Sequence, residues 1–305
     1  MFVSRVLPYL LIASLALVSA CSSKDREPDT VSETEVYERA QNQLNRNQWE
    51  QAIRSLQLLE EHFPFGVYAE QAQLELIYAY YRSNMMDSVH SAANRFIRLH
   101  PQHRNADYAY YMMGMASFTE GRGMFERVLP TDLSLRDPGA ARESLAHFSQ
   151  LLARYPDSVY AADAKQRMLH LRNLLARSEI HVANYYFKRG AYMAATNRGR
   201  HVLENYSQSP AVPDALAVMV QGYRLMGMED LSQQSLRVLR ENFPDHPALN
   251  AAGEFDFQYA GAGERSWISR LTFGLFDKRE PEGFDSRELY DPEYMRDDLR
   301  PRPQS

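Results

Sequence analysis

Cys21 is the residue whose position in the chain points most directly to a chemistry. It is the only cysteine among 305 residues, so we expect no intrachain disulfide, no thiolate metal site and no cysteine nucleophile. It follows a basic residue, Arg5, then an apolar run over residues 6–18 and two small residues. This order is typical of a secretory signal peptide, and the apolar run is too short to span a membrane stably.

The five residues that end in this cysteine are Leu17-Val18-Ser19-Ala20-Cys21. They resemble the lipobox of bacterial lipoproteins, in which the cysteine thiol is acylated and becomes the new N-terminus. We therefore expect residues 1–20 to be removed and Cys21 to carry acyl chains, which together anchor a protein more firmly than one chain does. The alternative is an ordinary secretion signal with an incidental cysteine.

The residue after the cysteine affects sorting in such lipoproteins, and aspartate there usually signals retention in the inner membrane. Here it is Ser22, so the resemblance implies an outer-membrane protein, lipid-anchored at the periplasmic face. Residues 21–33 are polar and contain too few large apolar side chains to fold alone. We expect them to form a lipidated flexible tether.

The rest of the chain offers little for catalysis. His100 and His103 could suggest a metal pair, but Pro101 interrupts the helix that would align them. The common phosphate-binding, hydrolase and metalloprotease signatures are absent from the sequence. We expect no enzymatic activity, no cofactor and no metal.

Charge argues against nucleic acid as a partner. The formal net charge at pH 7 is −5, and residues 1–20 hold a single charged side chain, Arg5. The mature chain therefore carries about −6, which is the wrong sign for a basic nucleic-acid-binding face.

An internal repeat in the sequence predicts the secondary-structure elements that would position any binding residues. His62-Phe63-Pro64-Phe65-Gly66-Val67-Tyr68-Ala69 matches Arg154-Tyr155-Pro156-Asp157-Ser158-Val159-Tyr160-Ala161, and related turns fall at positions 64, 101, 156, 207 and 244. The shortest spacing, 37 residues, is close to the period of a tetratricopeptide repeat (TPR). Small residues recur where the two helices of such a repeat cross, and apolar residues recur at helical spacing.

The repeat predicts an all-α fold, a right-handed TPR α-solenoid of about five helical hairpins, each covered by the next. Ala40, Ala52, Leu56 and Leu59 occupy the expected positions of the first hairpin. The predicted boundaries are TPR units over residues 34–116, an inserted loop over 117–138, further TPR units over 139–249 and a partly disordered C-terminal extension over 250–305.

A solenoid of this kind favours a binding module, because its concave face suits an extended peptide or the edge of another protein. The N-terminal half supplies many aromatic side chains for such a face, and tyrosine combines a large rigid contact area with a polar tip. The alternative for each of them is a place in the core. Adjacent tyrosines such as Tyr80 and Tyr81, however, cannot all face the same way on one helix.

Several longer segments resemble the BamD family of the β-barrel assembly machinery (BAM). They are Leu76-Ile77-Tyr78-Ala79-Tyr80-Tyr81, Arg95-Phe96-Ile97-Arg98-Leu99-His100-Pro101, Arg136-Asp137-Pro138 and Ala153-Arg154-Tyr155-Pro156-Asp157-Ser158. The resemblance extends over about residues 21–245 and is much more specific than the generic repeat.

The resemblance implies a set of partners. Members of the family bind a POTRA domain of BamA through the C-terminal repeats, take BamC and BamE as further partners, and contact unfolded outer-membrane proteins through the N-terminal repeats. The resemblance places substrate-peptide binding at Phe63, Phe65, Tyr68, Tyr78 and Tyr81. It places the BamA contact at Tyr185, Arg189, Asn197 and Arg198, and an arginine fork there can bind a carboxylate through two nitrogens.

Two questions stay open. A TPR lipoprotein adapter for another envelope assembly, such as a pilus secretin or a peptidoglycan-associated complex, is the alternative function. In the extension, Trp267 to Phe276 reads as a short amphipathic helix that either caps the last repeat or docks on a partner or a membrane. Residues 281–305 are rich in charge and proline, which favours disorder.

Overall fold

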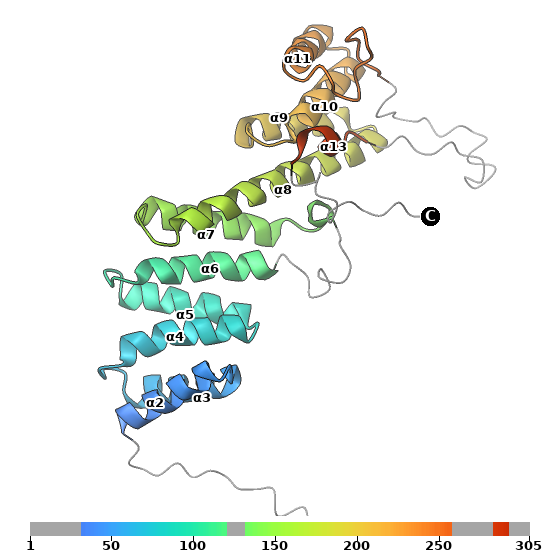
Figure 1. Cartoon of the computed structure of the whole chain (residues 1–305). Coiled ribbons are helices and arrows are strands. Elements are labelled where there is room, and N and C mark those ends of the chain that lie inside the picture. Colours follow the sequence, from blue (N-terminus) through green and yellow to red (C-terminus); the bar gives the residue numbers. More distant parts are fainter. Residues whose placement is uncertain (1–31, 121–131, 258–282, 293–305) are drawn as a thin grey trace, which may run out of the picture. The chain divides into compact units, whose positions relative to one another are not determined.

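The computed structural model describes residues 32–120, 132–257 and 283–292 (Figure 1). Within these ranges the regular elements are helices, apart from one isolated antiparallel bridge between Leu249 and Phe255. The all-α prediction is therefore confirmed. The chain divides into two compact units, which meet in the sequence at Ala79 and Tyr80.

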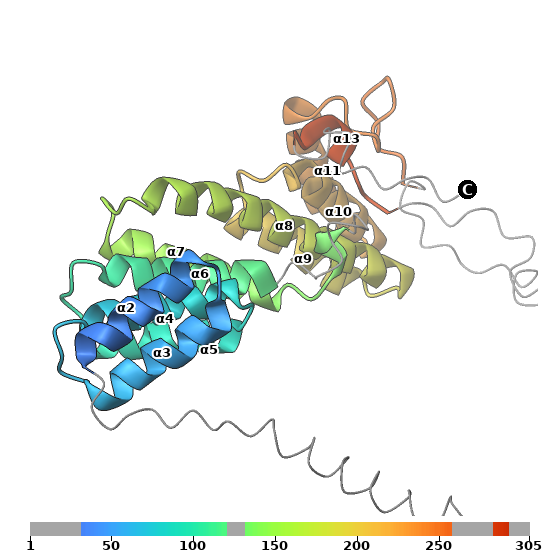
Figure 2. The same cartoon turned by 60° about the horizontal axis from the view of Figure 1, so that its bottom comes forward.

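The first unit contains α2 (Glu33–Asn45), α3 (Trp49–His62) and most of α4 (Ala69–Arg82). Figure 2 shows α2 and α3 side by side as a helical hairpin. Ser32 begins α2 with a capping box, because the backbone N–H of Glu35 donates to the Ser32 hydroxyl and the Glu35 carboxylate accepts from the Ser32 N–H, each over 3.3 Å.

Small residues let the two helices of this hairpin approach closely. Ala40 and Ala52 are fully buried, as are Leu56 and Leu59. The repeat positions predicted for the first hairpin are therefore confirmed, and the predicted turn at Pro64 separates α3 from α4.

The second unit continues with the same hairpin geometry. Each helix from α5 to α11 packs on the next one along the chain. The elements are α5 (Met86–Leu99), α6 (Ala106–Glu120), the 3-10 turn η2 (Leu133–Leu135), α7 (Gly139–Arg154), α8 (Ala161–Lys188), α9 (Tyr192–Asn205), α10 (Val212–Leu225), α11 (Glu229–Asn242) and the short α13 (Arg287–Tyr290). The turns predicted at positions 101, 156, 207 and 244 all follow the ends of helices.

One close crossing in this unit shows why the repeat needs small residues. The buried Ser144 hydroxyl of α7 donates to the carbonyl oxygen of Gly114 on α6 over 2.9 Å. A Cβ atom on Gly114 would lie 2.5 Å from the ring of Phe148, so only glycine lets the two helices approach this closely.

One boundary differs from the sequence prediction. Helix α6 continues to Glu120, three residues into the predicted loop, because Ser117 and Phe118 still face the core. The long spacing between the turns at 156 and 207 comes from α8, which is 28 residues long.

The C-terminal segment over residues 283–292 differs most from its prediction of disorder. Phe284 is fully buried against Phe187 and Phe255, with ring centroids 6.0 and 6.2 Å apart. The side-chain amide of Asn184 both donates to and accepts from the backbone of Phe284, over 3.1 and 3.0 Å. The backbone N–H of Ser286, the residue before α13 (red in Figures 1 and 2), donates to Asp214 of α10 over 2.9 Å, and Tyr290 of α13 contacts Phe243 at the end of α11. The prediction of disorder, made from composition, was wrong for these residues because a few specific contacts hold a segment that is otherwise polar.

Several predictions concern residues outside the described ranges. Cys21, the signal sequence over residues 1–20, most of the tether and the segment from Trp267 to Phe276 are among them. Within the described ranges, no helix combines the length and the apolar character needed to cross a bilayer.

Candidate partner-binding surfaces

In the first unit, two tyrosines form a stacked pair between α2 and the start of α4. The rings of Tyr37 and Tyr68 are nearly parallel, with centroids 4.2 Å apart and an interplanar angle of 11°. The backbone N–H of Tyr68 donates to the Glu33 carboxylate over 2.8 Å, which ties the turn to the beginning of α2. The pair offers a rigid aromatic surface.

The polar end of this pair is held by Glu75. Its carboxylate accepts hydrogen bonds from the Tyr37 hydroxyl at 3.0 Å, from Gln41 at 2.6 Å and from Gln71 at 2.8 Å. Burial and the negative charge of Glu75 raise the pKa of Tyr37 to about 12. The hydrogen bond from this hydroxyl to Glu75 fixes the orientation of the Tyr37 ring.

The substrate-binding residues predicted in this unit lie in different places. Tyr68 joins Tyr37, whereas Tyr78 contacts Trp49 edge-on with ring centroids 5.8 Å apart. Ten residues of helix separate these tyrosines, about 15 Å at 1.5 Å per residue. Phe63 is half-buried beside His62. They form separate contact points and share no single pocket.

Phe65 is the most exposed aromatic residue described. Its side chain is 99% exposed at the turn between α3 and α4, close to the exposed Val67. In the second unit the corresponding turn between α7 and α8 presents Val159, which is 84% exposed. Apolar side chains on projecting turns favour contact with another protein.

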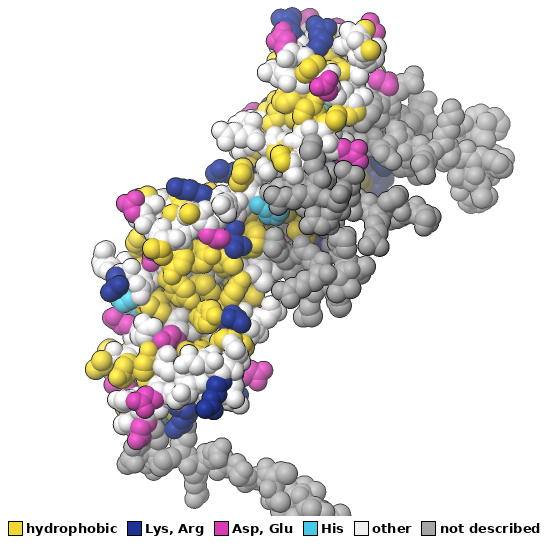
Figure 3. Space-filling model, viewed as in Figure 1, with side chains coloured by type: hydrophobic (Ala, Val, Ile, Leu, Met, Phe, Trp, Pro, Cys, Tyr) yellow, Lys and Arg dark blue, Asp and Glu magenta, His cyan; other side chains and the backbone are white. Residues whose placement is uncertain are grey.

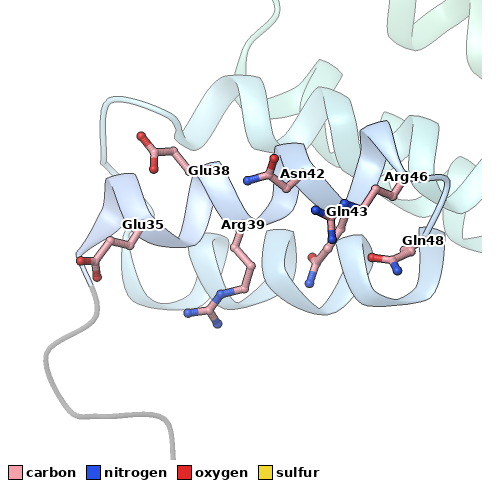
Figure 4. A pocket seen from close by; sticks show the side chains of 7 residues that line it. All are labelled: Glu35, Glu38, Arg39, Asn42, Gln43, Arg46 and Gln48. Atoms are coloured by element: carbon pink, nitrogen blue, oxygen red, sulfur yellow. The ribbon is translucent and has the colours of Figure 1, made fainter.

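The first unit also carries a polar depression along α2, shown in Figure 4. Seven side chains line it: Glu35, Glu38, Arg39, Asn42, Gln43, Arg46 and Gln48. Figure 4 shows them spread along the helix, with charges of both signs and without convergence on one point. This surface suits a polar segment better than an aromatic one.

In the second unit, a broad apolar surface lies over α6, where Figure 3 shows hydrophobic side chains gathered. Tyr111 stacks on Tyr160 with ring centroids 4.6 Å apart, and Tyr108 lies 5.8 Å from the same ring. All three tyrosines are partly exposed. They follow α6 and the start of α8, the first helices of successive hairpins, which favours a peptide-binding face.

Charged groups border this surface. The Tyr111 hydroxyl donates to Asp163 over 2.8 Å, and Arg167 pairs with the same carboxylate at 2.5 Å while its guanidinium lies 4.8 Å from the Phe118 ring centroid. Burial and the hydrogen bond to Asp163 raise the pKa of Tyr111 to about 12. Tyr81, predicted as a substrate contact, shares a 3.1 Å hydrogen bond with Thr119 at the end of α6.

The residues predicted to contact BamA form two small groups at α8 and α9. Tyr185 is half-exposed and accepts a hydrogen bond from Nε of Arg189 over 3.1 Å, with the guanidinium 5.3 Å from its ring centroid. Asn197 is exposed on α9. These three side chains are available to a partner.

Arg198 has an internal partner that the sequence did not reveal. Its Nη1 lies 2.8 Å from the carboxylate of Glu179, which is buried and also accepts from Arg142 at 3.5 Å. The hydrogen bond to Glu179 raises the pKa of Arg198 despite partial burial. Its side chain remains 40% exposed, so it can stabilise the hairpin and still face a partner.

His100 and His103 both pack on Phe96, with ring centroids 5.0 and 5.2 Å from it. These contacts give both histidines a place in the packing of the second hairpin.

The hairpins define a helical-repeat protein, and several of its aromatic side chains are exposed. The sequence matches the YfiO family, described as an outer membrane lipoprotein, over residues 29–239. A relative from Neisseria meningitidis serogroup A, named outer membrane protein assembly factor BamD, is 39% identical over 254 residues, which cover 81% of this chain and 95% of the relative. A protein of the same name from Xylella fastidiosa strain Temecula1 is 36% identical, and the match covers 79% of this chain and 83% of the relative. Another from Vibrio cholerae is 33% identical, and the match covers 76% of this chain and 96% of the relative.

The chain therefore belongs to this family of outer membrane lipoproteins. The resemblance to BamD, inferred from the turn segments and tyrosine runs, is confirmed.

Proposed function

We propose that this protein is a lipid-anchored, non-enzymatic scaffold of the β-barrel assembly machinery at the periplasmic face of the outer membrane. It binds BamA and unfolded outer-membrane proteins and assists their insertion, with BamC and BamE as further partners and Cys21 as the lipid attachment site. The observation that carries the proposal is the family membership, which extends over both compact units. The exposed aromatic surfaces support it, because unfolded β-barrel proteins present aromatic segments.

Affinity purification tests this proposal directly. When the tagged protein is solubilised in mild detergent and captured, we expect BamA to be recovered with it in near-stoichiometric amounts, as identified by mass spectrometry. Recovery of a secretin or of peptidoglycan-associated proteins in place of BamA would support the alternative function and overturn this one.

We assign the BamA contact to Tyr185, Arg189, Asn197 and Arg198. For Arg198→Ala we expect the binding free energy for a purified BamA POTRA fragment to weaken by about 2 kcal/mol, which raises the dissociation constant roughly thirtyfold. A loss of this size is common for an arginine at an interface. Isothermal titration calorimetry measures the change.

Arg142→Ala is the matched control, because it also removes one arginine from the buried Glu179. Equal losses for the two variants mean that Arg198 acts through Glu179 and the hairpin. An unchanged affinity for Arg198→Ala removes this residue from the interface.

We assign substrate binding to the aromatic residues Phe63, Phe65, Tyr68, Tyr78 and Tyr81. Phe65→Ala should weaken the binding of a peptide that carries the C-terminal strand of an outer-membrane protein by about 1–2 kcal/mol. Fluorescence anisotropy with a labelled peptide measures it. The fold should be unaffected, since the side chain is almost wholly exposed.

Val159→Ala serves as the control, since Val159 is also exposed and occupies the corresponding turn of the second unit. A loss for Val159→Ala as large as that for Phe65→Ala would contradict a specific role of the first turn.

A further inference from the structure

Three side chains of the second unit form a cluster that the surfaces above do not use. His90 lies on α5, and Glu143 and His147 lie on α7. Each can offer one ligand atom, and these atoms lie within 4.8 Å of one another. Two imidazoles and one carboxylate are a common ligand set for Zn²⁺.

The spacing on α7 fits a shared ion. Glu143 and His147 are four residues apart and therefore face the same side of the helix. Nε2 of His147 lies 3.6 Å from Oε1 of Glu143, which is too long for a hydrogen bond. Two atoms that bind one Zn²⁺ at about 2.0–2.1 Å in tetrahedral geometry lie about 3.3 Å apart. The Glu143–His147 pair is therefore close to this separation, and side-chain movement must bring the three ligand atoms, now within 4.8 Å of one another, to the same distance.

Both ring nitrogens of His147 are buried, and neither has a hydrogen-bond partner among the described residues. The side chain is 13% exposed. The ring of His90 lies beside it, tilted by 35° and with centroids 5.4 Å apart, and this contact gives the nitrogens of His147 no hydrogen bond. A buried polar atom normally has a partner, so its absence calls for a specific explanation.

His90 has a hydrogen-bond partner on one ring nitrogen, as is common for histidines that bind a metal through the other nitrogen. The buried hydroxyl of Ser117 on α6 lies 3.2 Å from its Nε2. Such a contact fixes the ring and leaves the other nitrogen to a metal.

We propose that His90, Glu143 and His147 bind one Zn²⁺ ion, which links α5 to α7 beside α6 and leaves a fourth position for water. The ion would join helices of two successive hairpins and stabilise their packing. The hard ions Mg²⁺ and Ca²⁺ are not expected to replace it, because they prefer oxygen ligands.

The test uses the chain from residue 21 onward with Cys21→Ser, so that no thiol competes for the metal. After removal of metals with EDTA and dialysis, ZnCl₂ is titrated in by calorimetry, and thermal unfolding is recorded with and without the ion. We expect one Zn²⁺ per chain, micromolar affinity or better and a higher melting temperature. CoCl₂ in place of zinc should give the visible spectrum of a nitrogen- and oxygen-bound tetrahedral ion.

Glu143→Gln and His147→Gln should each lower the affinity at least tenfold and remove the thermal shift. Glu143 is 54% exposed, so Glu143→Gln keeps the fold even if His147→Gln disturbs it. His62→Gln, at an exposed histidine of α3, is the control and should change neither quantity. Absence of stoichiometric binding by the unsubstituted protein, or equal binding by Glu143→Gln, overturns the proposal.

Discussion

Replacement of Asp214 by alanine should lower the free energy of unfolding by about 3–5 kcal/mol, since it breaks a buried charged network. Asp214 is fully buried on α10. Its carboxylate accepts from Arg177 of α8 at 2.6 Å, from His246 at 3.1 Å and from the backbone N–H of Ser286 at 2.9 Å. One side chain thus connects two helices, the turn after α11 and the C-terminal segment.

The large effect comes from what the substitution leaves behind. Arg177 is almost fully buried, so its charge loses its main partner without gaining water. The backbone N–H of Ala248 donates to Nδ1 of His246 over 3.1 Å, which places the ring proton on Nε2, where it donates to Asp214. Without the carboxylate this donor is also left unpaired.

The network also predicts how stability depends on pH. Burial opposes ionisation of Asp214, but Arg177 and His246 outweigh it and hold the pKa of the carboxyl well below its usual range. A carboxyl whose pKa is lower in the folded protein stabilises the fold above its unfolded value, about 3.9. That contribution is lost as pH falls toward the folded value, so the gap between wild type and Asp214→Ala should shrink below about pH 4.

Urea unfolding followed by circular dichroism at pH 7 and pH 3 measures both effects. Asp157→Ala, at an exposed turn residue, should stay within about 0.5 kcal/mol of the wild type. A loss below about 1 kcal/mol for Asp214→Ala at pH 7 would mean that the network contributes little.

This network marks a limit of the sequence reasoning. The turns, the small crossing residues and the apolar spacing repeat along the chain, so local patterns were sufficient to predict the hairpins. Arg177, Asp214 and His246 belong to no repeat and look like ordinary surface residues. Their partners lie 37 and 32 positions away in the sequence, and only the fold brings them together.

The candidate surfaces show the same division. The sequence showed many aromatic residues in the N-terminal half, but it did not show that Phe65 is exposed. It also did not pair Tyr68 with Tyr37 or Tyr111 with Tyr160, because stacking depends on how the helices are placed. Nor did it show that Arg198 is bonded to Glu179. The sequence predicted no metal site, because Glu143 and His147 are four residues apart on one helix whereas His90 lies on another, and only the fold brings the three side chains together.

Phe284→Ala should also be strongly destabilising, by about 3–5 kcal/mol, as is usual when a buried phenylalanine is truncated. The ring is fully buried between Phe187 and Phe255. Truncation leaves a cavity in the core of the C-terminal repeats and removes the main apolar contact of residues 283–292. What remains of the attachment is the edge-on contact of Tyr290 with Phe243 and a set of polar bonds. The polar bonds join Asn184 to the backbone of Phe284, the Ser286 N–H to Asp214, and Arg287 to Asp132 at 2.6 Å.

Limited trypsin digestion, compared with thermal unfolding, separates release of residues 283–292 from destabilisation of the repeats. Arg287 is shielded while the segment is packed, so the wild type should resist cleavage after it and Phe284→Ala should be cut there well below its melting temperature. Leu289→Ala is the matched control, because Leu289 lies in the same segment but is half-exposed; it should lose well under 1 kcal/mol and stay resistant. If Phe284→Ala melts like the wild type and resists trypsin, the segment does not depend on this ring. If it is cut early but melts normally, the segment is attached without supporting the repeats, and the terminal hairpins are stable without a cover.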